Sequence, residues 1–161
     1  MDLKLEYEQD FHQWIEHHIA LLKEKRFDEI DLEHLIDELE SMSKSDLREL
    51  RSRFVILIAH LLKWEFQLNQ LKDRWRDYSG NSWKGTISVQ RSEVIDLLKE
   101  NPSLKRFLSD SIDKAYPIAL KSAIAETGLS KSVFPSECPY TIEQLLDEDF
   151  FPIPKQTEKT T

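Results

Sequence analysis

An apolar run of nine residues, Phe54–Leu62, constrains the fold of this chain more than any other stretch. The run reads FVILIAHLL, and His60 is its one polar residue. In the surrounding segment, apolar residues form one broad face and also occupy much of the opposite side. A helix that is apolar all round is buried all round. We therefore predict a buried central helix over about residues 45–71, with Ser43 or Ser45 as its N-cap.

The same run is too short to cross a bilayer, which needs about 20 apolar residues. The first residues of the chain are charged and lack the apolar stretch of a signal peptide. The single cysteine, Cys138, excludes an intramolecular disulfide and suits a reducing compartment. We therefore expect a cytoplasmic protein. Its length of 161 residues favours a single domain over residues 1–151, followed by a flexible C-terminal tail over 152–161.

Apolar periodicity predicts four further helices and a short C-terminal one. Their expected ranges are about 7–25, 28–42, 83–100 and 103–127, and the short helix opens at the capping box of Thr141 and Gln144. Glycine is scarce, at 3 residues, which argues against a turn-rich β fold. We therefore predict an all-α fold: a helical bundle of about five main helices with a buried central helix.

Several local features qualify these helices. In the helix over 28–42, five apolar side chains are expected to form a buried stripe: Leu32, Leu35, Ile36, Leu39 and Met42. Ser82 can cap the helix over 83–100. Pro117 should kink or divide the helix over 103–127, because proline cannot donate the backbone hydrogen bond. Gly128 suits the left-handed position that ends that helix.

The formal net charge of −8 is unevenly distributed. Residues 1–42 carry four basic and thirteen acidic side chains. Residues 43–91 carry ten basic and five acidic side chains, and residues 92–161 carry eight basic and twelve acidic ones. An acidic chain is not a general nucleic-acid binder. The basic middle, 44–91, leaves weak nucleic-acid binding as an alternative, although we favour the interpretation that it faces the acidic N-terminal helices.

Polar side chains near the predicted apolar faces form the candidate site. Gln90 projects into the middle of the inner face of its helix, with Thr86 and Arg91 at its flanks, so it needs a specific hydrogen-bond partner. The full candidate cluster, for binding or as a polar core, is Asp31, Glu38, His60, Lys63, Trp83, Thr86, Gln90 and Arg91.

Two interpretations of this cluster stay open. In a ligand or enzymatic site, Glu38 or His60 would accept a proton, Arg91 would clamp an anion and Gln90 would orient the ligand. In the other interpretation, the same groups form a buried polar network that fixes the register of the helices.

Signals for metals, cofactors and covalent catalysis are weak. His34 and Glu38 have metal-ligand spacing, but no full ligand set follows. The chain has no P-loop, no glycine-rich dinucleotide turn and no nucleophile elbow. Cys138 lies between prolines and is interpreted as structural, and His18 as a core histidine satisfied by a carbonyl or carboxylate. We expect no cofactor and no metal.

Four segments, taken in order, carry a resemblance to a known family. They are DFHQWIEHHIALLKEKRFDEIDLEHLIDELESM, LIAHLLKWEFQ, SWKGTISVQRSEV with NPSL, and SECPYTIEQLLDEDFFP. Together they resemble the bacterial family called domain of unknown function twenty-nine, which is common in cyanobacteria. The resemblance spans about residues 5–152 and implies an all-helical, bundle-like fold without a defined activity. One departure is local, because Leu68 follows Gln67 where family members often carry a nearby proline.

The positions that match the family's pattern include most of the candidate cluster. They are Asp10, Trp14, Phe27, Asp31, Leu35, Glu38, His60, Leu61, Leu62, Lys63, Trp83, Thr86, Ile87, Gln90, Arg91, Pro139 and Tyr140. Because no catalytic motif accompanies them, we expect a non-catalytic protein-interaction or regulatory module with an as yet unidentified protein partner. An enzyme is the less favoured expectation.

Overall fold

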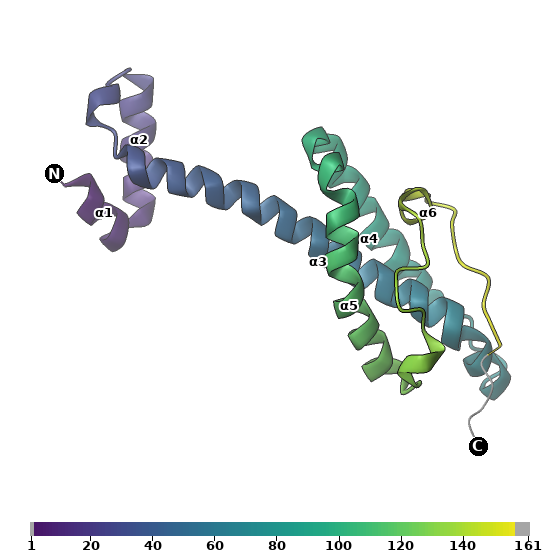
Figure 1. The fold of residues 1–161 in the computed structure, drawn as a ribbon. Helices are drawn as coiled ribbons and strands as arrows, with labels where there is room; N and C mark the ends of the chain where they lie inside the picture. Colours follow the sequence, from purple (N-terminus) through teal and green to yellow (C-terminus); the bar gives the residue numbers. More distant parts are fainter. Residues whose placement is uncertain (1, 157–161) are drawn as a thin grey trace. The chain divides into compact units, whose positions relative to one another are not determined.

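Residues 2–156 are described by a computed structural model, and every regular element in that range is helical (Figure 1). The α-helices are α1 (Leu3–Gln9), α2 (Phe11–Lys23), α3 (Leu32–Arg74), α4 (Asn81–Glu100), α5 (Leu108–Thr127) and α6 (Ile142–Leu146). Short 3₁₀ turns cover Phe27–Glu29, Pro102–Phe107 and Lys131–Val133. The predicted all-α class, with a long central helix and a short C-terminal one, is confirmed.

The chain divides into two compact units. Unit 1 is Met1–Asp46 and unit 2 is Leu47–Thr161, so α3 begins in the first and ends in the second. The expected single domain over 1–151 and the expected flexible tail stay predictions. Within that tail, the Asn69 side chain donates to the carbonyl of Pro154 and the Lys155 amide to the carbonyl of Glu65. Residues 157–161 lie outside the described residues.

The central helix begins earlier than the sequence predicted. We expected a break near Ser43 and Ser45, but both residues lie inside α3, which starts at Leu32 and has 43 residues. The physical reason is that no glycine or proline occurs between Leu32 and Arg74, so nothing in this stretch stops a helix once it has started. The serines are simply exposed helical positions.

The N-terminal segment contains two helices where we predicted one over 7–25. α1 ends and α2 begins at Asp10, whose backbone leaves the helical region at φ −148° and ψ 80°. Its carboxylate accepts a hydrogen bond from the Gln13 amide at 3.1 Å. Because an aspartate side chain satisfies the free amides of a helix start, it favours a new helix here.

Unit 1 buries polar groups and exposes apolar ones, contrary to the predicted stripe. Its fully buried residues are Glu6, Trp14, His18 and Asp31, and three of these four are polar. The side chains expected to form the buried stripe of α3 are instead exposed: Leu32 by 61%, Ile36 by 46%, Leu39 by 58% and Met42 by 64%, and Leu35 is partly exposed. The stripe prediction was therefore wrong.

Unit 2 has the apolar core that the central run predicted. Most of Phe54–Leu62 is buried there, while Val55 and His60 are half-buried and Ile56 is 37% exposed. Side chains of α4, α5 and α6 complete the core, among them Ile87, Ala115 and Leu145. Residues outside the helices, among them Phe134 and Tyr140, also belong to this core. The burial of this part of α3 agrees with its apolar periphery.

The later helix ends follow local chemistry. The capping box of Thr141 and Gln144 and the left-handed Gly128 are both confirmed. The predicted fifth helix is shorter at its start, because residues 102–107 form a 3₁₀ turn, and Pro117 does not divide α5. At the start of α4 the cap is Gly80, in place of the predicted Ser82.

Gly80 occupies a position that only glycine fits. Its φ of +71° lies in the left-handed region, and an added Cβ would stand 2.8 Å from Cδ1 of Leu68. Gly85, one turn into the same helix, has open space around it. Alanine should be unfavourable at the first position and favourable at the second.

We predict that Gly80→Ala lowers the free energy of unfolding by about 1–3 kcal/mol, through left-handed strain and the contact with Leu68. Gly85→Ala should raise it by about 0.5–1 kcal/mol, because alanine is the better helix former. Urea unfolding of both variants and the wild type measures the difference. Equal stability of the two variants would contradict the described start of α4.

Candidate functional site

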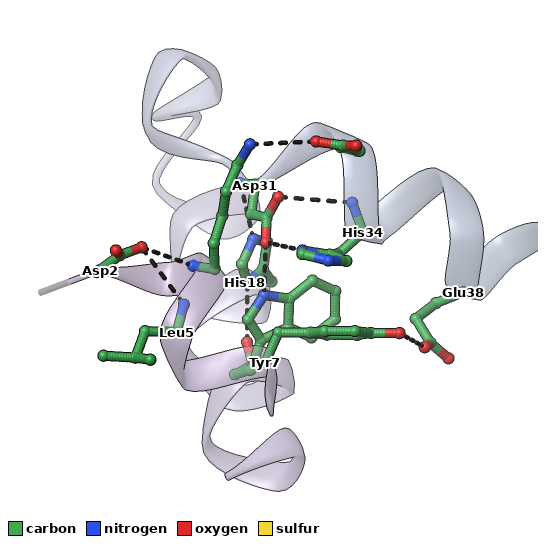
Figure 2. Close-up of polar contacts among 10 residues, drawn as sticks. Asp2, Leu5, Tyr7, His18, Asp31, His34 and Glu38 are labelled. Carbon is green, nitrogen blue, oxygen red and sulfur yellow. Dashed lines mark hydrogen bonds and ion pairs between the residues drawn. The ribbon is translucent and has the colours of Figure 1, made fainter. Parts of the chain in front are cut away.

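Asp31 is a buried carboxylate at which several polar contacts of unit 1 meet (Figure 2). Its side chain is 1% exposed. Oδ2 accepts hydrogen bonds from Nε1 of Trp14 at 3.3 Å and from Nδ1 of His34 at 2.6 Å. The Asp31 backbone N–H donates to Nε2 of His18 at 2.9 Å. One residue at the start of α3 thus binds two side chains of α2 and one of its own helix.

His18 uses both of its ring nitrogens inside unit 1. Because Nε2 accepts the Asp31 amide, the ring proton must lie on Nδ1, which donates to the Trp14 carbonyl at 2.8 Å. The ring also lies against the Trp14 indole, with ring centroids 4.1 Å apart. The interpretation of His18 as a satisfied core histidine is confirmed. A fully paired imidazole has no nitrogen left for a metal or a substrate.

Tyr7 joins α1 to the polar face of α3. Its hydroxyl donates to the carboxylate of Glu38, and its ring stacks on His34 with centroids 4.0 Å apart and an interplanar angle of 16° (Figure 2). His34 and Glu38 are one turn apart, so α3 turns a polar side toward α1. The i, i+4 spacing of His34 and Glu38 also fits metal ligation, but here it lets both side chains contact Tyr7.

Hydrogen bonding fixes the charge of Asp31. Burial alone would raise the pKa of this carboxyl, but hydrogen bonds from His34 and Trp14 outweigh burial and lower the pKa below its ordinary value. Asp31 is therefore an anion at neutral pH, and it accepts its hydrogen bonds from its own chain. Sequence reasoning included Asp31 and Glu38 but missed Tyr7, which lies 31 residues before its hydrogen-bond partner Glu38.

In unit 2 the structure brings together three predicted residues, His60, Lys63 and Trp83. Lys63 is 6% exposed and its ammonium pairs with the carboxylate of Glu126 on α5. The same Nζ lies 3.4 Å from Nε2 of His60 and 5.6 Å from the centre of the Trp83 ring. Glu126 was missed, because nothing in the sequence marks which exposed acid of a distant helix faces a buried lysine.

His60 is held as a neutral acceptor toward Lys63. Burial, and secondarily the Lys63 charge, lower the pKa of the imidazole below its ordinary value. Its Nδ1 donates to the Ile56 carbonyl at 2.8 Å, which leaves Nε2 to accept from Lys63. The group therefore contains a cation, an anion and a neutral imidazole that satisfy one another.

Arg91, and not Gln90, is the polar residue buried on the inner face of α4. Arg91 is 1% exposed and follows Ile87 by one turn, whereas Gln90 is half-buried and accepts a hydrogen bond from Arg53 at 3.3 Å. Thr86 donates to the Ser82 carbonyl in its own helix. The prediction that Gln90 lies in the middle of the inner face, with Arg91 at its flank, was therefore wrong.

Arg91 closes the C-terminal end of α6. Its Nε donates to the Leu145 carbonyl at 2.9 Å and Nη2 to the Gln144 carbonyl at 3.5 Å. The last carbonyls of a helix lack intrahelical donors, so a buried guanidinium satisfies them. Nη1 is also buried and has no hydrogen-bond partner among residues 2–156. Position 91 fixes the C-terminal segment to α4.

Glu65 is a further polar residue that sequence reasoning missed. Oε2 accepts from the hydroxyl of Tyr140 at 3.0 Å, and Oε1 lies 3.8 Å from Nζ of Lys155. Burial and the adjacent Glu65 raise the pKa of Tyr140 far above its ordinary value, so the phenol stays protonated.

An open cavity of about 600 Å³ lies between α5 and the segment 136–142. Tyr116, Cys138 and Tyr140 line it. Burial raises the pKa of the Cys138 thiol, and the thiolate is the nucleophilic form. The environment of Cys138 is therefore that of a structural thiol.

The eight predicted site residues divide between the two units. Asp31 and Glu38 belong to unit 1, and His60, Lys63, Trp83, Thr86, Gln90 and Arg91 belong to unit 2. Each makes the contacts given above. Among residues 2–156, no group of three or more His, Cys, Asp or Glu side chains is arranged to hold a metal ion. Within that same range no helix combines the length and apolar character needed to span a membrane.

Comparison with known proteins supports the resemblance seen in the sequence. A family model described as "Domain of unknown function DUF29" matches residues 6–151, which takes in nearly all of the four segments. No curated protein and no solved structure matches the chain.

We predict that the stability of unit 1 falls in acid because of Asp31. A carboxyl whose pKa is lowered by folding stabilises the fold fully above its unfolded pKa of about 3.9, and this contribution is lost as the pH falls through the folded value. Asp31→Asn should cost about 1–3 kcal/mol at neutral pH and weaken this acid dependence. Hydrogen exchange of the α2 amides at pH 7, and from pH 5 down to pH 2, measures both effects.

The matched control is Asp28→Asn, at an exposed position three residues earlier. In this variant the hydrogen-exchange rates of the α2 amides should match those of the wild type over the whole pH range. If Asp31→Asn also followed the wild type, the buried carboxylate would not be the group that holds unit 1.

Proposed function

The chain belongs to the DUF29 family, and we propose that it is a non-catalytic module that binds a protein partner through unit 1. The observation that carries the proposal is the exposure of apolar side chains there. Of the fourteen large apolar side chains that are exposed among the described residues, nine lie in unit 1: Leu5, Phe11, Ile19, Leu22, Phe27, Leu32, Ile36, Leu39 and Met42. Unit 1 contains less than a third of the chain.

The polar contacts explain why this surface is available. Trp14 is the one apolar residue that is fully buried among the described residues of unit 1, and Glu6, His18 and Asp31 fill the other buried positions. α3 packs its polar side, His34 and Glu38, against Tyr7. The exposed side chains of Leu32, Ile36, Leu39 and Met42 therefore do not contribute to a core within unit 1.

Such exposure has an energetic meaning. Transferring one large apolar side chain from water into an interface contributes about 1.5–3 kcal/mol. Contiguous exposed apolar surface in a folded chain marks sites of interaction with other proteins. The hydrogen bonding of unit 1 supports the same proposal, because Asp31, His18 and Glu38 form their hydrogen bonds within their own chain.

The two alternatives from the sequence remain predictions. One is a ligand or enzymatic site that uses Glu38, His60, Gln90 and Arg91. The other is weak nucleic-acid binding through 44–91. In the structure, Arg53 of this basic segment lies 3.7 Å from Glu49 and 3.9 Å from Glu93, and Arg74 stacks on Trp75. These contacts favour neither alternative over protein binding.

We predict that a protein captured from native lysate by the tagged chain is lost when Leu39 and Met42 are changed to serine. The two serines remove exposed apolar surface and leave the buried contacts of unit 1 intact. Quantitative mass spectrometry after mild cross-linking measures the captured proteins. We expect recovery to fall by about tenfold or more, equivalent to the loss of one buried apolar contact.

The matched control is Val89→Ser with Ile118→Ser, which removes similarly exposed apolar side chains from unit 2. Circular dichroism first verifies that both double variants are folded. The control should retain the captured protein. If both double variants captured what the wild type captures, or if the wild type captured nothing, unit 1 would not be a protein-binding module.

A further inference from the structure

We infer that the partner contributes a basic amphipathic helix, which docks along the first turns of α3. This inference rests on the proposed function and specifies the chemistry of the partner. Four exposed apolar side chains define the docking stripe: Leu32, Ile36, Leu39 and Met42. Spacings of four, three and three residues place them on one side of a helix. At 1.5 Å per residue the stripe is about 15 Å long, or about three helical turns.

A second stripe of side chains runs beside the first, and it is acidic. Glu33, Asp37 and Glu40 each follow a stripe residue by one position and repeat at the same helical spacing. Glu33 is paired with Lys4 at 3.1 Å, but Asp37 and Glu40 form no ion pair with any residue in the range 2–156. These carboxylates are exposed, so they are available to an incoming cation.

The charge of the whole unit reinforces the local pattern. Residues 1–46 carry five basic and fourteen acidic side chains, a net charge of −9. A field of this sign attracts a cationic partner and repels nucleic acid, an anionic lipid surface and unit 1 of a second copy. An apolar partner without charge would bury the carboxylates beside the stripe without compensation, which is unfavourable.

The stripe geometry defines the shape of the ligand. A helix that lies along another helix presents apolar side chains at i, i+3 or i+4, and i+7, which is the spacing of Leu32, Ile36 and Leu39. Lysine or arginine residues along one flank of that face would lie opposite Asp37 and Glu40. Apolar contacts would supply most of the affinity, and the charges would select the partner and its orientation.

The test uses three synthetic helical peptides of about 18 residues, long enough for five turns. One combines a leucine face with lysine flanks, one has the same leucine face with glutamate flanks, and one has lysine flanks with serine in place of leucine. Fluorescence anisotropy measures the binding of each labelled peptide to the full chain. We expect the leucine–lysine peptide to bind at least about tenfold more tightly than the other two, and more weakly as salt is raised.

Two double variants and a control assign the binding to the two stripes. Leu39→Ser with Met42→Ser should weaken the leucine–lysine peptide by about tenfold or more. Asp37→Asn with Glu40→Gln should weaken it by about threefold to tenfold and reduce its salt dependence. Asp96→Asn with Glu100→Gln makes the same charge change at exposed positions of α4 and should leave binding unchanged.

The possible failures are distinguishable. Equal binding of the lysine and glutamate peptides would overturn the basic helix, while the captured protein of the previous experiment would still support a binding module. The inference would also be overturned if the α4 control weakened peptide binding as much as Asp37→Asn with Glu40→Gln does, because the attraction would then not be local to α3. Concentration-dependent self-association of the full chain that is lost in Leu39→Ser with Met42→Ser would identify a second copy as the occupant and overturn the inference.

Discussion

Unit 1 depends on the hydrogen bonds that the buried carboxylate of Asp31 accepts. A charge in a protein interior is unfavourable unless donors surround it, and Asp31 has the indole of Trp14 and the imidazole of His34 as donors. Its backbone amide is satisfied by His18. These contacts come from two helices and meet at one residue, so they fix how α2 meets the start of α3. A small unit can then fold around one tryptophan and a polar network.

The exposed apolar surface is a consequence of this arrangement. Because the polar side of α3 faces Tyr7 and α2 supplies Trp14 and His18, the stripe from Leu32 to Met42 is left on the outside. Unit 2 has the usual distribution, with apolar side chains in its core. Two buried cations hold its later helices: Lys63 pairs with Glu126 of α5, and Arg91 donates to the Leu145 carbonyl of α6. The two units therefore differ in what they bury: unit 2 has an apolar core, whereas unit 1 buries one tryptophan and three polar residues.

Sequence reasoning succeeded where the pattern is local. The run at Phe54–Leu62 predicted a buried helix, and Gly128 and Thr141 predicted helix boundaries, because each depends on residues within a few positions. It failed for the stripe of Leu32–Met42, since apolar periodicity predicts which side chains share a face and not whether that face is covered. Gln90 and Arg91 are adjacent, and periodicity alone did not distinguish the buried side chain from the half-buried one. Glu126 and Tyr7 lie far along the chain from their partners, so no spacing rule finds them.

The central claim is that a specific polar network, and not an apolar core, holds unit 1. The tautomer of His18 tests it most directly, because the network requires the ring proton on Nδ1, donating to the Trp14 carbonyl, and a bare Nε2 that accepts the Asp31 amide. Long-range proton–nitrogen NMR of the imidazole rings distinguishes the two neutral tautomers. The account predicts the Nδ1–H tautomer for His18 at neutral pH, with exchange of the Asp31 amide slowed by its hydrogen bond. An Nε2–H tautomer, or a ring that interconverts freely between the two, would contradict it.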